Sequence, residues 1–65
     1  MPYQSINDLP DRVKDHLPQH AQEIFRAAFN HALDEYKDED RAFATAWNAV
    51  ERDYEKGSDG QWRKK

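Results

Sequence analysis

The sequence contains no cysteine, few glycines and prolines, and no long apolar run. Without cysteine, disulfides and cysteine-ligated zinc or iron–sulfur sites are excluded, and such a chain fits the reducing cytosol. No basic region precedes an apolar run at the N-terminus, so we expect no signal peptide. No stretch approaches the roughly 20 apolar residues of a membrane-spanning helix. We therefore expect a soluble, cytoplasmic protein without direct membrane insertion.

The chain has 65 residues, of which 10 are basic and 13 acidic, and a net charge of −3. This length allows one domain. The acidic balance counts against binding of nucleic acid or an anionic membrane over the whole surface, although a local basic patch is still compatible with it. Aromatic residues make up 12% of the chain, which favours a folded domain over a disordered acidic segment.

Three segments show apolar residues at helical spacing, and the first is short. Leu9, Val13 and Leu17 recur every four residues and form one stripe. Asn7 and Asp8 are suited to cap this helix, and Pro10 to its first turn, where no N–H donor is needed. The helix should end at Leu17, because a proline follows and disfavours the α conformation of the residue before it.

The second pattern predicts a helix from Pro18 to about Tyr36. Its apolar residues cover roughly half of the helix circumference, so this helix must pack against more than one neighbour. The expected apolar face consists of Ala21, Ile24, Phe25, Ala28, Phe29, Ala32, Leu33 and Tyr36. The expected solvent face consists of Glu23, Arg26, Asn30, Asp34 and Lys37.

The third pattern predicts a helix from about Glu39 to Glu55, with Asp38 as its N-cap and Gly57 just beyond its end. The expected core stripe consists of Phe43, Trp47, Val50 and Tyr54, with Ala42, Ala46 and Ala49 beside it. Only Lys37 and its neighbours separate this helix from the preceding one. The two should therefore form an antiparallel hairpin.

The chain ends are less regular, with a turn at residues 58–60. Tyr3 and Trp62 are expected to cover the core, as two short strands that pair. The predicted fold is mainly α, a compact three-helix domain with a small β-sheet formed by the terminal segments. This single domain should span residues 1–62, followed by a basic C-terminal tail at residues 63–65.

An acidic run is the first candidate site, and we call it the acidic corner. It consists of Asp34, Glu35, Asp38, Glu39 and Asp40. It lacks the central glycine of an EF-hand. Residues 38–40 can be helix caps, whereas Asp34 and Glu35 oppose the dipole of the preceding helix by about 0.3–1 kcal/mol each. The corner is either a solvated charged surface or a functional one, for docking a protein or weakly binding a cation.

Basic residues near the C-terminus form an alternative candidate site for nucleic acid. They are Lys56, Arg63, Lys64 and Lys65. These side chains could contact phosphate, but binding typically needs a larger basic cluster. A basic terminus that only aids solubility is the simpler explanation.

No catalytic, cofactor or metal site is expected from the sequence. The three histidines are His16, His20 and His31. His20 and His31 share a helix face but lie about 16 Å apart along the axis, too far to share one metal ion. A nucleophilic cysteine is missing, and the acids fall on predicted solvent faces, so we do not expect an enzyme.

Several motifs resemble the ChaB family over nearly the whole chain, from Pro2 to Trp62. They are Asp8-Leu9-Pro10, Val13-Lys14, His16-Leu17-Pro18-Gln19-His20-Ala21-Gln22, Ala28-Phe29-Asn30, Ala46-Trp47-Asn48-Ala49-Val50 and Tyr54-Glu55-Lys56-Gly57. Phe25 stands where the family often has tyrosine and Leu33 where it often has tryptophan, and both changes keep core character. The linker between the second and third helices is short here, while some relatives carry an insertion.

The resemblance implies a compact domain of helices with a small sheet made by the termini. It also implies a regulator of cation transport, from gene neighbourhood with a sodium, calcium or potassium/proton antiporter, and it brings no catalytic residues. We therefore predict a small cytoplasmic accessory protein, monomeric, that docks on a cation antiporter or another protein and modulates it. The alternative is a small nucleic-acid-associated domain, since domains of this family also look like partners of nucleic-acid-binding modules.

Overall fold

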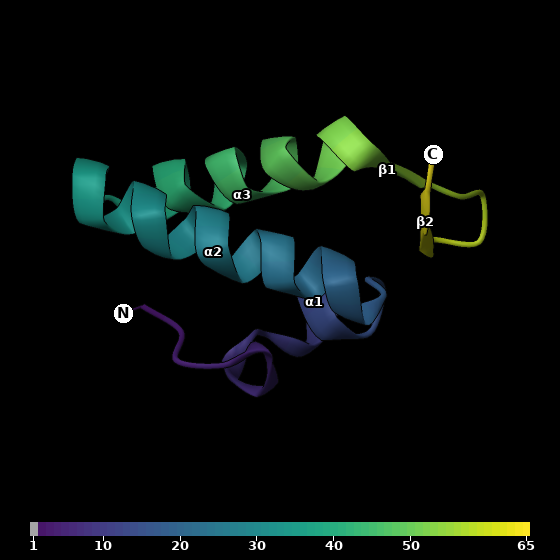
Figure 1. Ribbon diagram of the computed structural model, residues 1–65, viewed down its shortest axis with the longest axis horizontal. Coiled ribbons are helices and arrows are strands. Elements are labelled where there is room, and N and C mark those ends of the chain that lie inside the picture. The colour runs from purple at the N-terminus through teal and green to yellow at the C-terminus, as the bar shows by residue number, and fades with distance from the viewer. Residues whose placement is uncertain (1) are drawn as a thin grey trace.

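The computed structural model describes residues 2–65 as a helical hairpin, flanked by a short N-terminal helical segment and a C-terminal β-hairpin (Figure 1). The expected mainly α fold with a small sheet is confirmed. The elements are a 3₁₀ helix η1 (Ile6–Asp8), α1 (Asp11–Lys14), α2 (Gln19–Tyr36), α3 (Glu39–Asp53), β1 (Tyr54–Lys56) and β2 (Trp62–Lys64).

The turn between α2 and α3 is two residues long, and the predicted antiparallel hairpin is confirmed (Figure 1). Lys37 adopts the left-handed conformation (φ 57°), and its N–H donates to the Leu33 carbonyl at 2.8 Å, which ends α2. The Asp38 carboxylate accepts hydrogen bonds from the N–H groups of Asp40 and Arg41 at 2.9 and 3.3 Å, which begins α3 as predicted.

The core lies between α2 and α3, where small residues of α3 face large ones of α2. Phe25 and Phe29 of α2 are fully buried. On α3 the fully buried residues are Ala42, Ala46 and Val50. Two aromatic residues expected at the centre of the α3 stripe, Phe43 and Trp47, are only partly buried and lie at its edge. The alanines take the central line because they allow the helices to approach closely.

Helix α3 ends at Asp53, two residues earlier than predicted. Tyr54 has extended backbone angles (φ −130°, ψ 156°) and begins β1, while its side chain stays buried. Gly57 is therefore a turn residue of the β-hairpin rather than the end of a helix. At the end of α2, the expected core residue Tyr36 is 42% exposed. Its ring lies 4.4 Å beneath the guanidinium of Arg41, a cation–π contact on the surface.

The first helical segment differs from its prediction in the way it begins. The expected stripe of Leu9, Val13 and Leu17 is buried, and this part is confirmed. The α-helix begins only at Asp11, with Pro10 as its N-cap. The residues expected to cap it instead form η1, a separate turn of 3₁₀ helix.

The N-terminal segment is held against α2 by side chains expected in solvent. The Tyr3 N–H donates to Asn30 Oδ1 at 2.8 Å, and Asn30 Nδ2 donates to the Tyr3 carbonyl at 2.7 Å. Arg26 also donates to that carbonyl, at 3.3 Å. The Tyr3 ring packs against the Phe29 ring, with 4.8 Å between the ring centroids. The prediction of a polar solvent face was wrong here, because the face carries the N-terminal segment.

The β-hairpin contains both strands of the sheet, which pair antiparallel with Tyr54 opposite Lys64 and Lys56 opposite Trp62. The expected pairing of Tyr3 with Trp62 is wrong, since Tyr3 lies outside both strands. The Trp62 N–H instead donates to the carbonyl of His16 at 2.9 Å, which attaches the hairpin to the turn that follows α1.

Candidate functional site

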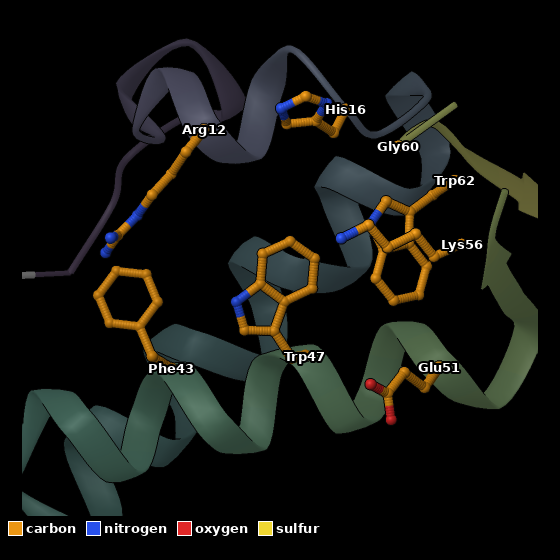
Figure 2. Close-up of a pocket in the computed structure, with 8 residues that line it drawn as sticks. All are labelled: Arg12, His16, Phe43, Trp47, Glu51, Lys56, Gly60 and Trp62. Carbon is orange, nitrogen blue, oxygen red and sulfur yellow. The ribbon is translucent and has the colours of Figure 1, made fainter. Parts of the chain in front are cut away.

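An open groove of about 470 Å³ lies where α1, α3 and the β-hairpin meet. It is lined by Arg12, His16, Phe43, Trp47, Glu51, Lys56, Gly60 and Trp62 (Figure 2). We call this surface the aromatic groove. Sequence reasoning missed it as a site because it assigned the aromatic residues to the core and grouped Lys56 with the basic residues near the C-terminus.

Three rings form the apolar floor of the aromatic groove. Phe43 and Trp47 lie one helical turn apart on α3 and share a face. The ring of Trp62 stacks on Trp47, with 5.4 Å between the centroids and 26° between the planes. Figure 2 shows Trp47 in the middle, between the other two rings. All three side chains are half-buried, so the floor combines contacts with the core and an apolar surface open to a ligand.

Two cationic side chains border these rings. The guanidinium of Arg12 lies 5.2 Å from the centroid of Phe43 (Figure 2). Lys56 stands opposite Trp62 in the strand pair, which places both side chains on one face of the hairpin. Among residues 2–65, neither cation forms an ion pair with an acidic side chain. Glu51 of α3 is the one acidic residue in the lining of the groove.

The acidic corner lies at the turn between α2 and α3, at the end of the molecule opposite the β-hairpin (Figure 1). Asp34 pairs with Lys37 at 3.5 Å, and Glu35 lies 3.5 Å from His31. The Asp34 and Glu35 side chains are 89% and 55% exposed, so these pairs stabilise the fold little. The Lys37 ammonium offsets part of the unfavourable position of Asp34 in the last turn of the helix.

A second hollow, of about 460 Å³, borders the acidic corner. It is lined by Pro2, Asn30, Leu33, Asp34 and Lys37. Burial raises the pKa of the nearby Tyr3 hydroxyl, and the Glu39 carboxylate raises it further while Arg12 lowers it. Pro2 of the N-terminal segment and Leu33 of α2 place an apolar surface beside Asp34, and no residue spacing predicts this contact.

The basic residues near the C-terminus do not gather into one patch. Arg63 forms a bidentate pair with Asp59 at 2.8 and 3.3 Å, and this hydrogen bonding lowers the pKa of Asp59 and raises that of Arg63. Lys56 and Lys64 lie on the other face of the hairpin, since strand residues alternate. Arg63 and Lys64 belong to β2, and the Lys65 N–H donates to the Asp53 carbonyl.

Within residues 2–65, no three histidine or acidic side chains are placed to hold a metal ion. No helix in the described part of the chain is long and apolar enough to cross a membrane.

Known proteins resemble this chain over its full length. The family model described as ChaB matches residues 9–65. Two proteins named "Putative cation transport regulator ChaB", from Escherichia coli K12 and Shigella flexneri, are each 47% identical over 75 residues, covering 100% of this chain and 99% of theirs. A solved structure, "NMR solution structure of the putative cation transport regulator ChaB", matches with a TM-score of 0.90 and 46% identity, covering 98% of this chain and 99% of that one. The chain belongs to the ChaB family.

Proposed function

We propose that this protein regulates cation transport as a small, non-catalytic accessory protein that docks on a protein partner. The proposed partner is a membrane cation/proton antiporter, and the proposed location is the cytoplasm. The name carried by the relatives, which describes a regulator of cation transport, supports the general role. The structural observation that carries the docking proposal is the exposed acidic corner with an apolar hollow beside it.

The acidic corner has the properties of a protein-docking surface. Its exposed carboxylates attract a basic partner surface over about a Debye length and so raise the association rate. The adjoining hollow offers the apolar side chain of Leu33, partly buried, next to the carboxylate of Asp34. An apolar centre with a charged rim is the usual anatomy of a protein interface.

Transport in everted membrane vesicles tests this function. The vesicles come from cells that express a cation/proton antiporter as the proposed partner, and dissipation of the pH gradient by Na⁺ or Ca²⁺ is followed with a fluorescent amine. We expect the purified protein to change the cation-dependent rate. The variant Asp34→Asn/Glu35→Gln should require about tenfold more protein for the same effect, because charge pairs at an interface act mainly on the association rate.

A matched control separates this effect from a simple loss of negative charge. The variant Glu23→Gln/Glu55→Gln removes two exposed acids outside the acidic corner and should act like the wild type. If the wild-type protein leaves transport unchanged at every concentration, the proposed regulatory function is wrong. If both double variants lose potency equally, the acidic corner is not the docking surface.

A further inference from the structure

We propose that the aromatic groove binds a short acidic peptide segment, in which a large apolar side chain is flanked by carboxylates. The inference rests on the proposed function, because it takes the segment to be part of the protein partner. It assigns a second and chemically different contact, separate from the acidic corner.

The floor of the aromatic groove is suited to hold one large apolar side chain. Trp47 and Trp62 stack on each other and leave one side of the pair open, and Phe43 extends the floor along α3 (Figure 2). The volume of about 470 Å³ lies within the range of about 300–1,000 Å³ that is typical of ligand sites. Tryptophan is also a residue type that dominates the binding energy of protein interfaces.

The charges of the groove select an acidic partner. Arg12 and Lys56 contribute two positive charges against the single carboxylate of Glu51, in a chain whose net charge is −3. The Trp47–Trp62 stack and the hydrogen bond from the Trp62 N–H to the His16 carbonyl hold the hairpin on the helices. With no acidic side chain of residues 2–65 paired to them, both cations are available to a ligand, and Arg12 can pair with a carboxylate in bidentate fashion.

A peptide fits this arrangement better than a nucleic acid does. Arg12 lies beside Phe43, and Lys56 lies beside Trp62, so the cations border different parts of the aromatic floor. A peptide can place its acidic residues near each cation and its apolar residue between them. A nucleic acid strand would bring evenly spaced phosphates past Glu51 without a continuous basic track, and such a track supplies most of nonspecific affinity.

Binding of a defined peptide tests the proposal. The probe is a capped synthetic peptide with a Leu-Phe pair between two glutamates on each side. Its affinity is measured by titration calorimetry and by the fluorescence of the two tryptophans at low salt. We expect saturable binding that falls about tenfold when glutamines replace the glutamates, since each exposed charge pair contributes modestly. Replacing Leu-Phe by Ala-Ala should abolish detectable binding.

Charge variants of the protein locate the binding site. Arg12→Gln/Lys56→Gln removes the two cations of the groove and should weaken peptide binding about tenfold. Arg52→Gln/Lys65→Gln removes two exposed cations outside it and should bind like the wild type. These four side chains are exposed, so the variants should fold, and a circular dichroism melt checks that they do.

Four results would overturn this proposal. The first is that the probe peptide does not bind, and the second is that both charge variants weaken peptide binding equally. The third is that single-stranded oligothymidine binds more tightly than the peptide at physiological salt. The fourth is that the chain dimerises through the groove and so displaces the peptide. None of these bears on transport in vesicles. A protein that regulates transport but does not bind the peptide retains the proposed function without this site. A protein that binds the peptide but leaves transport unchanged retains the site without the function.

Discussion

The aromatic groove and the acidic corner lie at different places on one small domain, and different forces dominate them. The groove is built from half-buried rings that also hold the β-hairpin on the helices. The corner is built from exposed carboxylates at a two-residue turn. Packing at the groove therefore links stability to binding, whereas the corner can change its charge at little cost to the fold. Substitutions at the groove, at the N-terminal segment and at the corner should therefore differ in their effect on stability.

Truncation of Trp47 to alanine should destabilise the domain most. The ring of Trp47 contacts Phe25 with 5.0 Å between centroids and Trp62 with 5.4 Å. Loss of this ring should lower the free energy of unfolding by about 3 kcal/mol. This is the lower end of the range for truncating a large aromatic residue, because the side chain is only partly buried. Since a domain of this size has about 3–5 kcal/mol of stability, we expect loss of a cooperative melt. A melt within a few degrees of wild type would show that the groove carries little of the stability.

Removal of the side-chain clamp on the N-terminal segment should have an intermediate effect. Asn30→Ala deletes both hydrogen bonds to the Tyr3 backbone, which leaves the Tyr3 N–H to water and the Tyr3 carbonyl to water and Arg26. We expect a loss of about 1–2 kcal/mol, measured by urea unfolding, and exposure of the Tyr3 ring. Asn48→Ala, on an exposed position of α3, is the control and should change stability by less than about 0.5 kcal/mol.

Neutralising the acidic corner should change stability least. In Asp34→Asn/Glu35→Gln, the lost pairs with Lys37 and His31 are opposed by the removal of acids from a helix C-terminus. We expect a net change within about 0.5 kcal/mol of zero, measured by urea unfolding at low and high salt. A loss of several kcal/mol would mean that the corner is part of the structural framework.

The helices were predictable from the sequence because their signals are local. Pro18 precedes α2, the cap at Asp38 begins α3, and the apolar spacing of α2 was long enough to define its length. The end of α3 was not predictable, because Tyr54 continues the helical pattern yet is drawn into a strand by pairing with Lys64. That pairing depends on residues ten positions later and has no signal within one helical turn.

The candidate sites were predictable only in part, since side-chain contacts between distant segments define them. The acidic corner is contiguous in sequence, and the structure keeps its residues together at one turn. The aromatic groove combines residues from Arg12 to Trp62, and no spacing rule connects them. One signal was present in the sequence. Ala42 and Ala46 allow a close approach of the two helices, which leaves too little room between them for the rings of Phe43 and Trp47, so these rings had to lie at an edge.

The most direct test of a groove that acts separately from the corner is a proton–nitrogen correlation spectrum during titration with the acidic probe peptide. The chain has two tryptophans, and both belong to the groove, so the two indole N–H signals report on it alone. We predict that both indole signals shift with saturation, while the backbone amides of residues 34–40 stay in place. Shifts at residues 34–40 with unmoved indole signals would contradict the account.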